Sequence, residues 1–332
     1  MDLVTALLDP QAYLEPTQRV DLIQTHISLV FLTDCHAYKV KKAVDLGFLN
    51  FTTLKRRHYF LQQELILNRR LAPEIYLEVL PVVAQGQGVQ MGGGGEPLEY
   101  ALKMRRMPQE QMMDEVADRG ELTSEIMDRI INRLVPFYQQ AETGPRINKF
   151  GELTLIAYNH EENFARTEKY VGSVLSREAF RDIVAYAWSF MTSQEGIFAE
   201  RIREGRIRDC HGDLHMRNIC LANDIYIFDC IEFNPRFRYG DVVADIGFLA
   251  MDLDFHGFQD LSDYFVQNFA RAADDPGTLQ MVNFYKCYRA CVRGKINAFA
   301  ADQQEQEAGG RQAALEQARA YFNLAWKYAR RG

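Results

Sequence analysis

The sequence of 332 residues has little of what marks secreted, membrane or fibrous proteins. Its six cysteines are scattered and too few to suggest a disulfide framework, so free thiols in a reducing compartment are expected. No run approaches the roughly 18 apolar residues of a membrane-spanning helix. The N-terminal stretch MDLVTALLDP has neither the basic segment nor the cleavage pattern of a signal peptide. We therefore expect a cytoplasmic protein that does not act at a membrane.

The sequence also lacks an excess of positive charge. It has 38 Lys and Arg against 45 Asp and Glu, a net charge of −7. Nucleic acids bind to basic surfaces, so we expect no nucleic-acid partner. The glycine-rich stretch GQGVQMGGGG lacks the spacing of a P-loop and lies between two predicted strands. It is interpreted as the flexible tip of a hairpin.

The first hundred residues predict a small antiparallel sheet with one helix. Residues 3–24 have helical patterns broken at Pro10 and Pro16. The segments ISLVFLT and AYKVKKAV form an apolar and an alternating run, which predicts two paired strands. Residues 53–71 have the spacing of an amphipathic helix, with Thr52 or Thr53 as its cap. IYLEVLPVVA and LEYALKMRRM then predict two further strands.

Beyond Pro108 the pattern becomes helical, at 121–141, 161–171, 176–204 and from 241 onward, around a strand-rich segment at 207–233. The fold class predicted is α+β. An N-terminal antiparallel-sheet lobe is expected at 1–106, joined by a short linker to a larger helical C-terminal lobe at 107–332.

The segment CHGDLHMRNICLANDIYIFDCIEF, at 210–233, contains the clearest chemical signal. A polar loop leads into ICL and IYIFD, two short strands that predict a hairpin. Asp213, Asn218 and Asp229 are expected at one edge of it. A carboxylate can orient an acceptor hydroxyl and accept its proton. An amide oxygen and a second carboxylate suit Mg²⁺ bound together with phosphates, as phosphoryl transfer requires.

HGDLHMRN resembles the catalytic loop of the aminoglycoside phosphotransferase and choline kinase family, which has a bilobal protein-kinase-like fold. The spacing from Asp213 to Asn218 is that of H-R-D-x-x-x-x-N, and IFDCIEF resembles the metal-binding strand end of the family. The resemblance implies that Asp213 is the catalytic base, with Asn218 and Asp229 as metal ligands. His211 is expected to orient the loop.

The run FDCIEFNPRFRYGDVVADIGFLAMDLD resembles more specifically an uncharacterised bacterial subfamily, often fused to a P-loop ATPase domain. This sequence has no G-x-x-x-x-G-K-[ST]. Asp245, in GDVVADIGFL, is expected to brace the catalytic loop. The cysteines around this segment match no zinc-site spacing and are interpreted as packed side chains.

Lys41 is the predicted phosphate-binding lysine. In AYKVKK, strand alternation places Lys39 and Lys41 on one face, so Lys39 remains an alternative, as does Lys42. A lysine on the second strand of such a sheet can reach the α- and β-phosphates of ATP. Glu64, the only acidic residue in the body of the following helix, is its expected partner.

Two further positions are expected to contact the nucleotide. Ser28 lies where the chain enters the first hairpin, the place of the phosphate cover in this fold. Met104, in the linker LKMRRMP, is expected to pack on the adenine ring.

The sequence thus predicts an ATP- and Mg²⁺-dependent kinase that transfers the γ-phosphate to a hydroxyl of a small-molecule acceptor. The alternatives are an inactive nucleotide-binding or scaffold protein with this fold, and a protein kinase. A protein kinase is disfavoured because no A-P-E segment follows Asp229. Neither the acceptor nor the oligomeric state can be deduced from the sequence.

Overall fold

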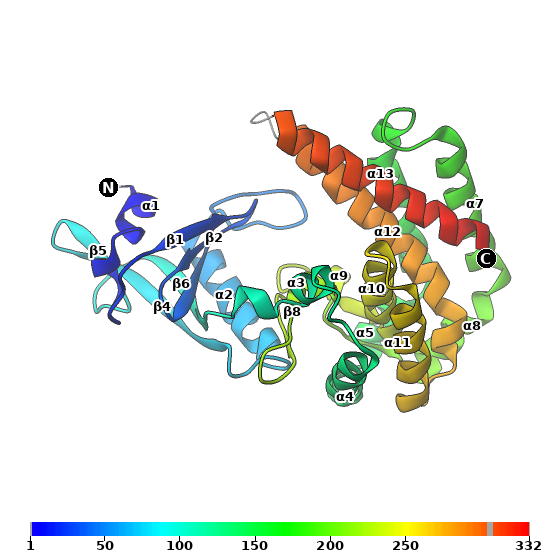
Figure 1. Cartoon of the computed structure of the whole chain (residues 1–332), viewed down its shortest axis with the longest axis horizontal. Coiled ribbons are helices and arrows are strands. Elements are labelled where there is room, and N and C mark those ends of the chain that lie inside the picture. Colours follow the sequence, from blue (N-terminus) through cyan, green and yellow to red (C-terminus); the bar gives the residue numbers. More distant parts are fainter. Residues whose placement is uncertain (1, 304–307, 332) are drawn as a thin grey trace. The chain divides into compact units, whose positions relative to one another are not determined.

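The computed structural model describes residues 2–303 and 308–331, which divide into two compact units. The sheet unit comprises Met1–Val116 and Arg217–Pro235, and the helical unit comprises Ala117–Met216 and Arg236–Gly332 (Figure 1). The chain therefore passes from the sheet unit into the helical unit, returns to the sheet unit at 217–235, and then enters the helical unit again. The predicted division at 106/107 places residues 217–235 in the helical lobe, whereas they pack in the sheet unit.

The sheet unit is built on one six-stranded antiparallel sheet in the order β1-β2-β3-β6-β4-β5. Its elements are α1 (Leu3–Leu7), a 3₁₀ turn (Pro10–Ala12), β1 (Asp21–Gln24), β2 (Ser28–Leu32), β3 (His36–Lys41), α2 (Leu54–Asn68), β4 (Tyr76–Gln85), β5 (Gly88–Met91), β6 (Pro97–Arg105), a 3₁₀ turn (Gln109–Gln111) and α3 (Met113–Asp118).

The predicted hairpin and the following helix are confirmed. Strands β2 and β3 pair with Ser28 opposite Lys41, and Thr53 caps α2 by accepting the backbone N–H of Arg56. Two expectations were wrong. Residues 21–24 form strand β1 rather than helix, because they pair with β2. The glycine-rich stretch contains strand β5, which pairs with the end of β4 and is more than a loose tip.

Alternation along β3 sends its side chains to two different layers. Tyr38 and Val40 belong to an apolar cluster with Leu7 and Tyr13, so α1 and the first 3₁₀ turn cover this face of the sheet. Helix α2 covers the other face, where Leu61 packs with residues of β4 and β6. The lysines of β3 point to the α2 side.

The segment that returns to the sheet unit forms a small hairpin. Strands β8 (Ile219–Cys220) and β9 (Tyr226–Ile227) pair antiparallel, as the sequence predicts. Leu221 N–H donates to the carbonyl oxygen of Gln111 at 2.7 Å. Tyr226 and Phe228 pack against the apolar cluster beneath α2. The hairpin is therefore fixed to the sheet unit by both backbone and side chains.

The helical unit is built from helices and one two-stranded ribbon. Its elements are α4 (Ser124–Gln140), α5 (Pro145–Asn148), a 3₁₀ turn (Lys149–Gly151), α6 (Leu153–Thr167), a 3₁₀ turn (Glu168–Tyr170), α7 (Arg177–Ser193), α8 (Glu195–Arg203), β7 (Ile207–Asp209), α9 (Pro235–Arg238), β10 (Tyr239–Asp241), α10 (Val242–Phe255), α11 (Gln259–Ala272), α12 (Gly277–Gln303) and α13 (Ala308–Arg331). A 3₁₀ turn (Met216–Asn218) leads back to the sheet unit.

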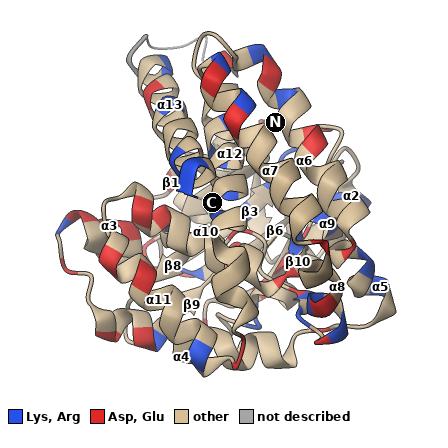
Figure 2. Ribbon diagram, turned by 90° about the vertical axis from the view of Figure 1, so that its right-hand side faces the viewer, with Lys and Arg blue, Asp and Glu red and all other residues tan. Residues whose placement is uncertain are grey.

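The core of this unit lies around α10, of which 12 of 14 residues are buried. Helices α12 and α13 lie side by side, and their apolar faces enclose Phe322 and Tyr321 (Figure 1). Acidic and basic residues both occur along α13 (Figure 2). The predicted helix at 176–204 is two helices, α7 and α8, separated at Gln194. Within the described residues, no helix combines the length and apolarity needed to cross a membrane.

Candidate active site

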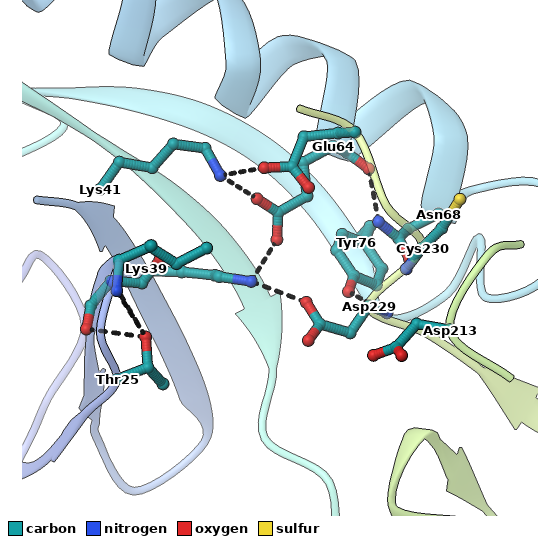
Figure 3. A network of polar contacts seen from close by, with 12 residues as sticks. Thr25, Lys39, Lys41, Glu64, Asn68, Tyr76, Asp213, Asp229 and Cys230 are labelled. Carbon is teal, nitrogen blue, oxygen red and sulfur yellow. Dashed lines mark hydrogen bonds and ion pairs between the residues drawn. The ribbon is translucent and has the colours of Figure 1, made fainter. Parts of the chain in front are cut away.

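The lysines of β3 converge on one glutamate of α2. Lys39 Nζ lies 2.6 Å from Glu64 Oε1, and Lys41 Nζ lies 2.7 Å from Glu64 Oε2 (Figure 3). Each lysine has a second acidic partner. Lys39 contacts Asp229 Oδ1 at 2.8 Å, and Lys41 contacts Glu232 Oε1 at 2.6 Å. The structure thus brings the predicted Lys41–Glu64 pair together. Lys39 contacts the other oxygen of the same Glu64 carboxylate at a similar distance.

The surroundings of the two lysines differ. The Lys41 side chain is 0% exposed and its ammonium lies 4.8 Å from the centroid of the Phe51 ring. The Lys39 side chain is 14% exposed, and its partner Asp229 is 47% exposed. Lys39 is therefore the lysine that borders a solvent-accessible carboxylate, whereas Lys41 is enclosed.

Opposite charges determine the ionisation of this network. Burial alone would raise the pKa of Glu64, but the charges of Lys39 and Lys41 outweigh it and lower that pKa to about 2. Burial would lower the pKa of Lys39, but Asp229 and Glu64 raise it well above its ordinary value. Glu64 and Lys39 are therefore both charged at neutral pH.

Asn218 and Asp229 lie next to each other at one end of the β8–β9 hairpin. The Phe228 N–H donates to the Asn218 carbonyl oxygen at 3.0 Å, which closes the ladder just before Asp229. Asn218 is buried, while the Asp229 side chain is 47% exposed. An amide oxygen and an accessible carboxylate are hard donors that could hold Mg²⁺ if phosphate and water oxygens complete the shell. Among the described residues, no group of three His, Cys, Asp or Glu side chains is arranged to hold a metal.

The predicted catalytic loop lies in the helical unit as far as Met216. Asp213 Oδ2 is 3.3 Å from His215 Nε2, and Asp213 N–H donates to His211 Nδ1 at 3.3 Å. Burial would raise the pKa of Asp213, but His215, Arg293 and His211 together lower it. Its side chain is 35% exposed and ionised at neutral pH. His211 thus contacts the Asp213 backbone, and its expected role in orienting the loop stays a prediction.

Helix α10 holds both ends of that loop. Asp245 accepts the His211 N–H at 2.7 Å and the Gly212 N–H at 2.9 Å. Asp252, two turns further along the same face, accepts the Met216 N–H at 3.0 Å. The Asp245 brace is as predicted. Asp252 was missed, although its heptad spacing from Asp245 on a largely apolar helix is a signal that could have identified it.

The backbone conformation of the H-G-D turn explains why its second residue is glycine. Gly212 has φ 87°, in the left-handed region that side chains disfavour. The turn lets two successive amides point at the same Asp245 carboxylate. A residue with a Cβ would strain this turn and disturb the position of Asp213.

The phosphate cover expected near Ser28 is a tight turn between β1 and β2. Thr25 N–H donates to the Ser28 carbonyl at 2.9 Å, and Ser28 N–H donates to Thr25 Oγ1 at 2.9 Å. Ser28 is fully buried, and within the described structure its hydroxyl has no hydrogen-bond partner. Met104 lies on β6 beside Ala37 and packs against the cluster under α2. Their contacts with a nucleotide stay predictions.

The arrangement of elements is similar to that of two solved structures of kinase families. A choline/ethanolamine kinase family protein from Mesorhizobium loti superposes with a TM-score of 0.50 and 13% identity, over 95% of this chain and 94% of that one. An amicoumacin kinase in complex with AMP-PNP and Ca²⁺ superposes with a TM-score of 0.52 and 11% identity, over 96% and 91%. This chain has the kinase-like fold. The predicted α+β architecture with an antiparallel sheet and a larger helical part is confirmed.

Sequence comparison identifies relatives of this kinase-like chain, but these relatives are uncharacterised and indicate no activity. No protein-family model matches it. Uncharacterised proteins from Mycobacterium tuberculosis and Mycobacterium bovis are 33% identical to it over 296 residues, which is 87% of this chain and 57% of each relative. The chain therefore spans little more than half the length of these relatives.

The cysteines near the loops of the kinase-like fold behave as packed side chains. Cys210, Cys220 and Cys230 are 0–2% exposed, while Cys35 is exposed. All six are free thiols.

The low pKa of Glu64 makes stability depend on pH. The carboxyl has an ordinary pKa of 4.5 and about 2 in the folded protein, so its contribution is complete above 4.5 and is lost as pH falls toward 2. We expect the stability advantage of the native chain over Glu64→Gln to shrink by about 2 kcal/mol between pH 5 and pH 3. Urea unfolding of both proteins at each pH measures this. An advantage that stays constant or grows would contradict the assignment of charge.

Proposed function

We propose that this chain is a phosphotransferase that uses ATP and Mg²⁺ to phosphorylate a hydroxyl of a small-molecule acceptor. The observation that supports this best is the position of Lys39, whose ammonium joins Glu64 and Asp229 within one unit. A lysine held by a helix glutamate, next to an accessible carboxylate, is the arrangement that phosphoryl transfer needs for positioning and neutralising phosphates.

Each group has a distinct role in this proposal. Lys39 binds phosphate oxygens of ATP, and Glu64 keeps the lysine extended. Asn218 and Asp229 would hold Mg²⁺, which neutralises charge on the phosphates when bound. The turn from Thr25 to Ser28 would cover the phosphates. We assign the phosphate contact to Lys39 rather than to Lys41, because Lys41 is enclosed with Glu232.

Asp213 is the proposed base. Its carboxylate accepts a hydrogen bond from the acceptor hydroxyl and takes its proton as the new O–P bond forms. The bond between the γ-phosphorus and the bridging oxygen breaks, and ADP leaves with that oxygen. The lowered pKa of Asp213 keeps the carboxylate ionised at neutral pH, so that it can both orient the hydroxyl and accept its proton.

The amicoumacin kinase of the same fold is described as a complex with AMP-PNP and Ca²⁺, which supports a nucleotide site that uses a divalent cation. The other neighbour belongs to a family named for choline and ethanolamine, both small alcohols. At 11–13% identity these neighbours do not specify the acceptor of this chain.

Thermal unfolding with nucleotide tests this proposal against an inactive scaffold. We expect ATP with Mg²⁺ to raise the melting temperature, since a ligand at about 100 times its Kd adds about 2.7 kcal/mol. ATP without a divalent cation should stabilise less, and Asp229→Ala should remove the difference between the two conditions. An absence of any shift with ATP would count against the proposal.

A further inference from the structure

Asp229 is held in an unusual backbone conformation. Among the non-glycine residues that the structure describes, only Asp229 and Asp274 have positive φ, and that of Asp229 is 61°. The left-handed region is uncommon for residues other than glycine, although aspartate tolerates it better than most, and hydrogen bonds of the surrounding structure can impose it. The interactions that impose it also determine where the Asp229 carboxylate points.

Three successive amides are bound to three different partners. Phe228 N–H donates to the Asn218 carbonyl, Asp229 N–H donates to the Tyr76 hydroxyl at 3.1 Å, and Cys230 N–H donates to Asn68 Oδ1 at 2.9 Å. The two side-chain partners come from α2 and β4, more than 150 residues earlier in the sequence. The turn at Asp229 is thus shaped by the body of the sheet unit (Figure 3).

Both side-chain partners are themselves fixed. Tyr76 is 2% exposed and Asn68 is 1% exposed. Asn68 Nδ2 donates to the Glu64 carbonyl oxygen at 2.9 Å, which directs Oδ1 of the same amide to Cys230. Asn68 is one helical turn beyond Glu64, so one stretch of α2 holds both the lysine partner and the strand end that carries Asp229.

We propose that Tyr76 and Asn68 are positioning residues that orient the Asp229 carboxylate toward a divalent cation bound together with nucleotide. This rests on the proposed function, in which Asp229 is a metal ligand. Groups that orient a metal ligand commonly change metal affinity 10- to 100-fold when removed. Because Lys39 also contacts Asp229, the same two residues fix the carboxylate relative to that lysine.

The test compares two tyrosines of the sheet unit that each lose one hydroxyl. Tyr76→Phe removes the acceptor for the Asp229 amide. Tyr13→Phe removes a hydroxyl that donates to the Leu7 carbonyl at 2.7 Å in the opposite layer, and it is the matched control. Binding of Mn²⁺ is measured by electron paramagnetic resonance of the free ion in the presence of AMP-PNP.

We expect Tyr76→Phe to weaken Mn²⁺ binding roughly tenfold, while Tyr13→Phe binds like the native chain. Both should lower the melting temperature to a similar extent. Hydrogen exchange of the amides at 228–230, measured without nucleotide, should accelerate only in Tyr76→Phe. Asn68→Leu should repeat the effects of Tyr76→Phe, and Asn68→Asp, which keeps an acceptor oxygen, should restore part of the amide protection.

Native Mn²⁺ affinity in Tyr76→Phe would overturn the positioning role, and so would unchanged exchange at 228–230. Failure of the proposed function has a different signature. In that case the native chain itself would not bind Mn²⁺ with AMP-PNP, or Asp229→Ala would bind it equally well, and the role assigned to Tyr76 and Asn68 would fall with it.

Discussion

Asp213→Asn is expected to reduce the rate of phosphate transfer by about 10²–10⁴-fold while ATP·Mg²⁺ still binds. The amide keeps the size of the carboxylate but cannot take a proton from the acceptor. The backbone contacts of the loop with Asp245 and Asp252 do not involve the Asp213 side chain, so the fold should be preserved. Single-turnover transfer from labelled ATP measures the rate, and calorimetry measures nucleotide affinity.

Asp263→Asn, on the exposed side of α11, is the control for this substitution and should retain native rates. Equal transfer rates in Asp213→Asn and the native chain would remove Asp213 from the reaction.

Substitution of the three neighbouring lysines should separate their roles. Lys39→Ala is expected to lower turnover on the order of 10²-fold, since one donor to a transferring phosphoryl group is removed. Lys41→Ala is expected to destabilise the sheet unit by about 3–5 kcal/mol, because Glu232 and one oxygen of Glu64 are left buried without their partner. Urea unfolding and initial transfer rates distinguish the two effects.

Lys42→Ala is the internal control. Lys42 Nζ donates to the Thr25 carbonyl at 2.7 Å in a solvent-exposed hydrogen bond, so its loss should cost less than about 1 kcal/mol and lower turnover far less than Lys39→Ala does. A stable Lys41→Ala with lost turnover, together with an active Lys39→Ala, would reverse the assignment and restore Lys41 as the phosphate-binding lysine.

Much of the sheet unit could be predicted because its signals are local. The paired strands at Ser28 and Lys41, the Thr53 cap and the β8–β9 hairpin all follow from patterns within a few residues. Strand β1 and strand β5 could not be predicted, because their short segments become strands only by pairing with β2 and β4. Tertiary pairing here outweighs the local propensity of those residues.

The same distinction applies to the candidate site. Alternation places Lys39 and Lys41 on one face, but which lysine remains near solvent depends on Glu232 and Phe51, which the strand pattern does not contain. Tyr76 and Asn68 lie 153 and 162 residues from the amides they bind, and no spacing rule connects them. The sequence names the proposed reacting groups together with Glu64 and Asp245, whereas the contacts of Tyr76 and Asn68 become visible only in the fold.

The central claim is that this chain transfers the γ-phosphate of ATP to a hydroxyl. The most direct measurement is the transfer of label from [γ-³²P]ATP, with Mg²⁺, to a panel of aminoglycosides, sugars, amino alcohols and peptides. We predict label on at least one small-molecule acceptor with the native chain, and its loss with Asp213→Asn. Label that stays on ATP throughout the panel, in a chain that shows no stabilisation by ATP·Mg²⁺, would contradict the account.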